Sequence, residues 1–325
     1  MTVSPLDQLP TPYPGELWYS LVARDIRNRG QSQRLFRAHQ LLGPLSSTTG
    51  IVFPNRIGRL VQFANHRSPT DPVAFANAHT MLRYHLAFDR PERLEQVLDT
   101  SHAENRPLRD VVSHQRSPLD PQRLRFCRTC LDMDTAQVGE PYWHANHQIP
   151  FVINCSLHGD RLSDSQVPYV PRAGAFWTAH RSRCLPGELS RPPLAMSHSM
   201  SRAVAKVSLT AATSQRGLAA HGALHMTADD LVSLLRSHGF AGPHRTVATS
   251  RLDLQMERFA TGTGMRLSDL GGKRWWRATY TTARRRLCPI QHIFMRLFLL
   301  EQLWSSPHRN PINRDWEHRL VGDWA

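Results

Sequence analysis

The sequence predicts a mainly α-helical protein with one small embedded β module and a helical C-terminal region. Two observations support this fold class. Apolar residues recur at helical spacing in the first 90 residues and again over Ser201–Trp304. Residues 126–162 instead carry cysteines, glycine and aromatic residues without a helical period, apart from a turn of helix before Gly139. The prolines of residues 163–200 then indicate a linker or an irregular layer.

The N-terminal part predicts several short helices after an extended, proline-rich entry. The first helix begins near Gly15, because Leu17 and Leu21 are spaced i,i+4 and so lie on one helical face. Gly30 ends this helix. Proline and glycine separate the further helices that we expect, over residues 35–42, 57–64 and 73–88.

The balance of charged residues predicts a polyanionic partner. The 325 residues contain 40 Lys+Arg and 26 Asp+Glu, a formal net charge of +14, and the sequence pI is near 10.6. Only Lys206 and Lys273 are lysines, and arginine favours two-pronged contacts with phosphate, guanine edges or carboxylates. Charge alone therefore suggests nucleic acid, an acidic protein or anionic lipid. A GC-rich genome would also enrich arginine, but it would not by itself produce the positive excess.

Membrane insertion and export are not expected. Residues 1–14 lack the basic start and apolar run of a signal peptide. The most apolar segment, Ile290–Trp304, is interrupted by Arg296 and Glu301 and is shorter than the ~20 residues that span a bilayer. The five cysteines are odd in number and unevenly spaced, unlike a secreted disulfide scaffold. We expect a cytoplasmic protein that is nucleoid-associated when it binds DNA.

Two short Cys/His pairs predict a structural zinc site in a ribbon-like β module. Cys127 and Cys130 are separated by two residues, and after 24 further residues Cys155 and His158 repeat this spacing. Two such knuckles aim four side chains at one point, as in tetrahedral zinc sites. Four protein ligands leave no position for a catalytic water, so the metal would stabilise the fold. The alternative is that these are ordinary buried cysteines.

Other possible metal ligands lie between the knuckles. Either His144 or His147 could replace the histidine of the second knuckle. Asp132 and Asp134 have no third acidic partner nearby, and we interpret them as solvated turn residues. The chain contains no His-Glu-x-x-His segment, so the sequence does not support a zinc peptidase.

The C-terminal helical region has the outline of a helix-turn-helix. Thr227 and Asp230 form a capping box, Gly239 stops the helix that follows, and a second helix runs from about Val247. A recognition helix in this position would carry phosphate or base contacts. The turn is longer than the usual three or four residues, so a plain helical hairpin with solvated arginines is the alternative.

Basic residues of this region are the nucleic-acid-binding candidates. Trp275 and Trp276 interrupt the densest basic stretch, where they would either stack on bases or belong to the core. Residues 290–300 are expected to form a buried packing helix. The candidate contacts are Arg245, Arg251, Arg258, Lys273, Arg274, Arg277, Arg284, Arg285 and Arg286.

Several motifs occur in an order that is typical of one family. They are Pro12–Ser20 with Arg24, Phe126–Leu131, Gly139–Trp143 with His147–Pro150, and Cys155–Gly159. Together they resemble the TniQ/TnsD proteins, which select targets for a class of bacterial transposons. The resemblance covers residues 10–165 and is looser beyond them. Ser156 stands where the family usually has proline, which stiffens the turn less but leaves the metal ligands intact.

The resemblance implies an adaptor and not an enzyme. Family members recognise attachment-site DNA or a CRISPR RNA-guided effector ribonucleoprotein, and they recruit an AAA+ ATPase that brings in the transposase. The sequence has no Gly-x-x-x-x-Gly-Lys-[Ser/Thr] loop, so nucleotide hydrolysis would come from another chain. We expect Tyr13, Glu16 and Trp18 to contact the ATPase. Chain length favours the RNA-guided or short type, the basic C-terminal half favours direct DNA binding, and both stay open.

The expected organisation has five parts. They are residues 1–122, the N-terminal helical part; 123–165, the zinc module; 166–200, a linker; 201–304, a helical DNA- or effector-binding region; and 305–325, a polar tail. Two other function classes stay open, as does a homodimer. A zinc-stabilised transcription regulator would bind specific DNA without an ATPase. A zinc-dependent hydrolase would need an open coordination position.

Overall fold

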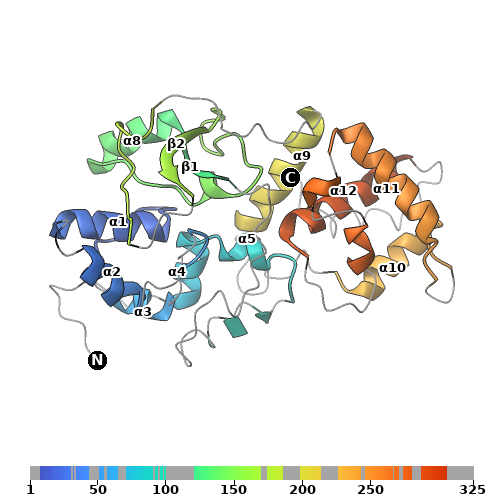
Figure 1. Ribbon diagram of the computed structural model, residues 1–325, viewed down its shortest axis with the longest axis horizontal. Coiled ribbons are helices and arrows are strands. Elements are labelled where there is room, and N and C mark those ends of the chain that lie inside the picture. Colours follow the sequence, from blue (N-terminus) through green and yellow to red (C-terminus); the bar gives the residue numbers. More distant parts are fainter. Residues whose placement is uncertain are drawn as a thin grey trace. The chain divides into compact units, whose positions relative to one another are not determined.

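In its described residues the computed structural model consists mostly of helices and has a two-stranded sheet, as the sequence predicts (Figure 1). It describes residues 8–30, 32, 34–43, 51–54, 57–64, 71–90, 92–93, 96–97, 99, 121–169, 174–185, 198–213, 226–242, 246–265, 267–270, 274–279 and 287–305. The chain divides into two compact units. Unit 1 comprises Met1–Arg83, Glu92–Ser113 and Pro121–Arg191, and unit 2 comprises Tyr84–Pro91, His114–Asp120 and Pro192–Ala325.

Short helices open the chain close to their predicted positions. They are α1 (Trp18–Arg29), α2 (Arg34–Leu42), α3 (Ile57–Phe63), α4 (Pro72–His79) and α5 (Leu82–Leu86). The prediction of one helix over residues 73–88 is wrong, because extended backbone at Thr80 ends α4. The Thr80 hydroxyl donates to the carbonyl of Ala76 at 2.6 Å and accepts from the amide of Leu82 at 3.0 Å. Thr80 thus ends one helix and starts the next.

α1 is the most buried of these helices. Every residue from Trp18 to Ile26 is buried, and this run includes two charged side chains. One of them, Asp25, binds Arg37 of α2 at 2.6 Å and Arg29 at 2.9 Å. The indole of Trp18 donates to the carbonyl of Ile51 at 2.8 Å. α1 is therefore fixed by ion pairs and hydrogen bonds as well as by apolar packing.

The β module begins with strand β1 (Arg123–Phe126), which pairs antiparallel with β2 (Ser163–Pro168). Helix α8 (Arg128–Val138) follows β1 directly, and the short 3₁₀ helix η3 (Asn146–Gln148) comes later. α8 is much longer than the single turn that we expected. Its buried positions are Cys130, Leu131 and Asp134, so its inner face carries little of the apolar signal that reveals a helix. Gly139 ends α8 in the left-handed conformation, with φ +82°.

Further helices follow in unit 2. They are α9 (His198–Thr213), α10 (Ala228–Ser237), α11 (Thr249–Thr263), the 3₁₀ turns η5 (Leu267–Leu270) and η6 (Trp275–Thr279), and α12 (Pro289–Ser305). The predicted capping box at the start of α10 is confirmed: Thr227 and Asp230 each bind the backbone of the other. Between α10 and α11, Ala241 and Val247 form a short antiparallel bridge.

The core of unit 2 is aromatic. Phe259 of α11 lies 4.9 Å from Phe294 and 5.6 Å from Phe298 of α12, measured between ring centroids. All described side chains from Ile293 to Leu300 are buried, which confirms the predicted packing helix. None of the helices within the described ranges is both long enough and apolar enough to cross a membrane.

Candidate metal centre

Two local structures bring the four predicted metal ligands together. Cys127 is the N-cap residue of α8 and Cys130 lies in its first turn, so a helix N-terminus forms the first knuckle. The second knuckle is a turn in which the amide of Gly159 donates to the carbonyl of Cys155 at 2.9 Å. That turn carries Cys155 and His158 on the same side. The four donor atoms lie within 4.8 Å of one another and could hold a metal ion.

The distances among these donors match the edges of a coordination tetrahedron. Bonds of ~2.3 Å to sulfur and ~2.0 Å to nitrogen give edges of about 3.8 Å between sulfurs and about 3.6 Å between sulfur and nitrogen. The Sγ atoms of Cys130 and Cys155 are 3.6 Å apart. His158 Nδ1 lies 3.6, 3.3 and 3.7 Å from the sulfurs of Cys127, Cys130 and Cys155. These four distances suit a four-coordinate cation.

Electrostatics inside the cluster favour a cation. Burial raises the pKa of the Cys130 thiol, and the neighbouring Cys155 and Cys127 sulfurs raise it further. Burial also raises the pKa of the Cys127 thiol. Several thiolates at this spacing repel one another, whereas a bound divalent ion stabilises the deprotonated form of each ligand.

Contacts around the donors join the two knuckles. The hydroxyl of Thr129, between the two cysteines of the first knuckle, donates to the Asp160 carboxylate that follows the second. The Asp160 Oδ2 atom also lies 3.6 Å from Cys127 Sγ. On the outer side, His158 Nε2 is 3.0 Å from the sulfur of Met133. Such outer partners orient metal ligands.

His144 and His147 lie beside the cluster and form a second group with Cys130. His147 Nε2 is 3.8 Å from Cys130 Sγ, and burial lowers the pKa of His147 well below its ordinary value. His144 binds the Asp134 carboxylate at 2.9 Å. Our interpretation of Asp134 as a solvated turn residue is therefore wrong, because it is a buried residue of α8. Asp132 is exposed.

Backbone pairing attaches this centre to the start of the chain. Glu16 and His144 form an isolated antiparallel bridge. Beside it, the amide of Leu17 donates to the carbonyl of Trp143 at 2.7 Å, and the amide of Ala145 donates to that of Gly15 at 2.9 Å. The Pro12–Ser20 motif thus pairs through its backbone with the segment that begins with the Gly139–Trp143 motif.

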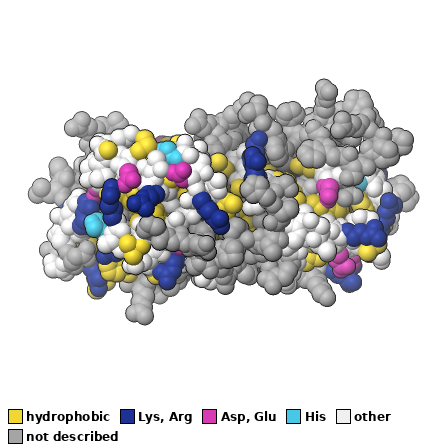
Figure 2. Space-filling view, turned by 90° about the horizontal axis from the view of Figure 1, so that it is seen from above, with side chains coloured by type: hydrophobic (Ala, Val, Ile, Leu, Met, Phe, Trp, Pro, Cys, Tyr) yellow, Lys and Arg dark blue, Asp and Glu magenta, His cyan; other side chains and the backbone are white. Residues whose placement is uncertain are grey.

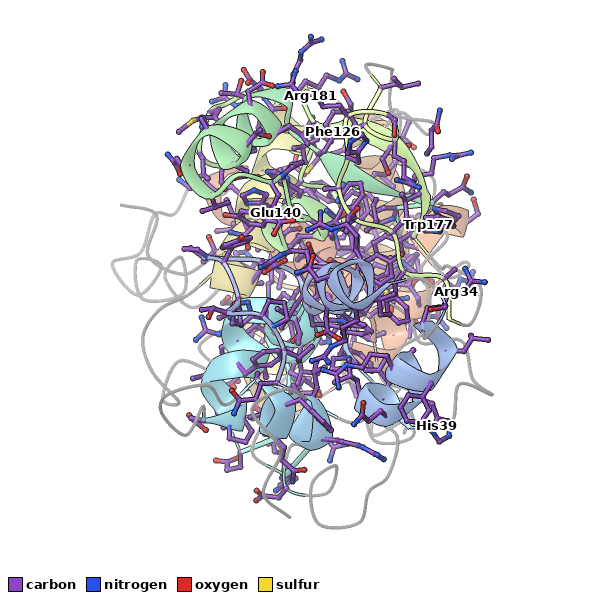
Figure 3. The ribbon with its side chains drawn as sticks, turned by 90° about the vertical axis from the view of Figure 1, so that its left-hand side faces the viewer. Arg34, His39, Phe126, Glu140, Trp177 and Arg181 are labelled. Atoms are coloured by element: carbon purple, nitrogen blue, oxygen red, sulfur yellow. The ribbon has the colours of Figure 1, made fainter. Side chains whose placement is uncertain are left out.

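A partly buried charge network lies next to this pairing. Arg24 donates to Glu16 at 2.6 Å and to Glu140 at 2.9 Å, and its guanidinium lies 3.7 Å from the centroid of the Tyr13 ring. Arg27 binds the second oxygen of Glu140, which Figure 3 labels. These arginines hold the pKa of Glu140 below its ordinary value. Arg24 of the first motif therefore binds Glu140 of the Gly139–Trp143 motif as well as Glu16 of its own.

Two of the three residues expected to contact a partner are inaccessible. The side chains of Glu16 and Trp18 are fully buried in unit 1, so a direct contact with another protein does not fit the structure. Tyr13 is partly exposed, and its hydroxyl donates to Glu140 at 3.1 Å. The sequence analysis assigned the Pro12–Ser20 motif to a partner-binding surface because a sequence motif does not show whether its side chains are buried.

The predicted nucleic-acid-binding residues differ in exposure and in their ion pairs. Arg251 and Arg258 are exposed on α11. Arg274 and Arg277 instead bind the buried carboxylate of Asp253, Arg274 at 3.2 Å. The remaining candidates, Arg245, Lys273, Arg284, Arg285 and Arg286, lie outside the described residues.

The two tryptophans of the basic stretch belong to the core. Trp275 and Trp276 are 3% and 0% exposed, so they cannot stack on bases. The indole of Trp276 donates to Asp253 at 2.9 Å. This buried acid lies on α11, far along the sequence from the tryptophans, and nothing in the basic stretch itself reveals it.

Sequence reasoning missed the pair of polar side chains that supports the sheet. The amide group of Gln148 accepts from the backbone N–H of Arg125 at 2.9 Å and donates to its carbonyl at 2.8 Å. The buried guanidinium of Arg125 donates to the carbonyls of Val152 and Ile149. The only available signal was that Gln148 stands inside the His147–Pro150 motif.

Comparison with known protein families gives an assignment for the region that contains the metal centre. Residues 8–162 match the TniQ family, and a search of curated proteins gives no match. The matched region contains all four donors of the metal centre and the charge network of Arg24. It ends shortly after the second knuckle. The family implies a role in transposon target selection, and the match assigns residues 8–162 to the TniQ family.

Proposed function

We propose that this protein is the non-catalytic target-selection adaptor of a bacterial transposon. It recognises a target platform, which is DNA or a CRISPR RNA-guided effector complex, and recruits an AAA+ ATPase and through it the transposase. The family match over residues 8–162 carries this proposal. The adaptor role is supported by a metal centre whose four donors all come from the protein.

Zinc is the metal that the donor set favours. Three thiolates and one imidazole are soft and borderline ligands, and their near-tetrahedral edges suit Zn²⁺. Cys127, Cys130, Cys155 and His158 would hold one structural ion. Bound there, zinc supplies folding energy and leaves no open position for substrate.

The metal would support the platform that the N-terminal motif forms. Cys130 is close to His147, and the ring of His147 lies 4.7 Å from that of His144. His144 in turn pairs with Glu16 through the backbone. A fixed metal centre therefore holds the pairing partner of the N-terminal segment in place.

Nucleic-acid contact is best supported on α11. Arg251 and Arg258 are exposed there, and exposed arginine can neutralise phosphate. Arg274 and Arg277 share one buried carboxylate, so their role in holding unit 2 together weakens the case for them as phosphate ligands. Direct DNA binding through α11 is thus part of the proposal, and the exposed arginines support it.

The test is a pull-down with the AAA+ ATPase of the same transposon, with and without target DNA. The adaptor should retain the ATPase in at least one condition. Sequence-specific DNA binding without any ATPase association would instead favour the zinc-stabilised transcription regulator. X-ray absorption at the zinc edge should show four Cys/His ligands, and an open position with bound water would support a hydrolase.

A further inference from the structure

The outward face of α2 carries apolar side chains that the fold leaves uncovered. Leu35 is 55% exposed and Phe36 is 70% exposed. His39, one turn after them, is exposed as well. Single exposed apolar residues are common on protein surfaces, but adjacent large ones indicate an interaction site. Among the described residues, Leu35 and Phe36 are the only two large exposed apolar side chains that are neighbours in sequence.

The opposite face of α2 is already complete. Arg37, Ala38, Leu41 and Leu42 are buried there. Arg37 binds Asp25 of α1 at 2.6 Å, and its guanidinium lies 5.3 Å from the centroid of the Phe63 ring. α2 therefore packs on unit 1 through this face, and Leu35 and Phe36 are not part of the core. Figure 3 labels Arg34 and His39 of α2 on the right-hand side of the view.

The segment around this face is strongly basic. Residues 26–70 contain seven arginines and no aspartate or glutamate. Two carboxylates from outside the segment offset part of this charge: Asp25 binds both Arg29 and Arg37, and Glu140 binds Arg27. Each acid faces more than one arginine, because Glu140 also binds Arg24. Within the described part of this segment, Arg34 is exposed on α2 itself and no carboxylate belongs to the segment, so an acidic partner would complement this face.

The metal side of unit 1 has a different character. Figure 2 shows acidic, basic, histidine and apolar side chains interspersed there, at the left of the view. Its exposed apolar residues include Leu157 and Met133, and Arg128 and Asp132 are exposed among them. A mixed surface of this kind gives no preference for the charge of a partner. α2 thus offers the more selective surface.

We propose that the α2 face, meaning Arg34, Leu35, Phe36 and His39, is the docking site for an acidic protein segment that carries apolar side chains. A protein partner fits better than nucleic acid. Exposed leucine and phenylalanine form the centre of protein interfaces with arginine at the rim, while Arg27, Arg29 and Arg37 are engaged in internal ion pairs. This inference rests on the proposed function, in which the partner is the AAA+ ATPase.

Binding of the purified ATPase to the full-length chain tests the inference. The Leu35→Ser/Phe36→Ser double variant should weaken the dissociation constant by at least about tenfold, because buried aromatic anchors dominate interface energies. Leu254→Ser is the matched control, since Leu254 is 48% exposed on α11 in unit 2. Both variants should melt at the wild-type temperature, because neither replaces a buried side chain.

Two further experiments test the charge of the partner segment and its contact with position 36. Arg34→Glu should weaken binding more at low salt than at high salt if the partner segment is acidic. A photo-crosslinking amino acid at position 36 should become linked to the ATPase.

Each outcome decides the matter. Wild-type affinity in the double variant would overturn the α2 site and leave the adaptor function standing. No binding by the wild type would overturn both. A crosslink from position 36 to DNA would replace the protein partner by nucleic acid and so overturn the inference.

Discussion

Arg24→Met tests whether the N-terminal motif is structural. The guanidinium of Arg24 binds Glu16 at 2.6 Å, with side-chain exposures of 4% and 0%. Methionine retains much of the aliphatic length but leaves the buried Glu16 carboxylate with neutral donors such as the amide of Tyr13, at 3.0 Å. Removing one partner of a buried ion pair costs about 3–5 kcal/mol, because a charge stays desolvated and uncompensated.

That cost is a large part of the free energy of unfolding, which is roughly 5–15 kcal/mol for a typical domain. For a unit of 150–250 residues, 1 kcal/mol lowers the melting temperature by about 2–4 °C. We therefore expect Arg24→Met to lower it by about 6–20 °C. Denaturant unfolding followed by circular dichroism measures the free energy, and calorimetry measures the melting temperature.

Arg181→Met is the matched control. The Arg181–Asp132 ion pair is also 2.6 Å long, but its side chains are 68% and 54% exposed. Exposed pairs contribute about 0–1 kcal/mol, so this substitution should change little. Equal effects of the two substitutions, or a cost below about 1 kcal/mol for Arg24→Met, would refute the reasoning from burial.

Acidity should rescue the Arg24→Met variant. Burial raises the pKa of Glu16 above its ordinary value, and Arg24 counteracts this rise. Without Arg24 the folded-state pKa of Glu16 rises further. Below the ordinary value of 4.5, Glu16 is protonated in the folded and unfolded states alike, so the charge penalty disappears. The defect should grow as pH rises from 4.5 to the folded-state pKa, because only the unfolded state then ionises. Unfolding measured across this range checks the sign.

Three further predictions concern the metal centre, α1 and α11. Cys155→Ser should reduce zinc content and melting temperature together, since structural zinc contributes about 10–16 kcal/mol in small modules. The control is Cys184→Ser, which replaces a buried thiol outside the donor set and should leave the zinc content measured by plasma emission unchanged. Trp18→Phe should cost about 1–3 kcal/mol of unfolding free energy, because the Ile51 carbonyl loses its donor, while ATPase binding by the folded variant stays at the wild-type level. Arg251→Ala/Arg258→Ala should make the log–log salt slope of DNA binding shallower by about 0.9 for each phosphate that is no longer neutralised, and an unchanged slope would remove these residues from the interface.

The metal donors were predictable because spacing alone specifies them. A cysteine at the start of a helix and another in its first turn lie on one side, whatever the other residues are. The matching second pair then fixes the chemistry of the site. The fold class was predictable for a similar reason, since helical periodicity is local information.

Burial of polar groups was not predictable in the same way. Asp134 lies in an apparently polar helix, and its burial depends on His144, which comes ten residues later. Asp253 neutralises arginines more than twenty residues away and also binds the indole of Trp276. Such pairs are fixed only when the packed fold brings distant side chains together. A single sequence therefore marks these residues as polar without showing where they go.

The pairing of α1 with later segments has a consequence for synthesis of the chain. The amide of Trp143 donates to the Ser20 hydroxyl, and the Tyr19 hydroxyl accepts from the amide of Trp177, interactions that span 123 and 158 residues. At about 5–20 residues per second, the ribosome needs roughly 6–30 s to deliver the later partners. During that interval the apolar surface of α1 lacks its native cover, and the nascent chain is most dependent on chaperones.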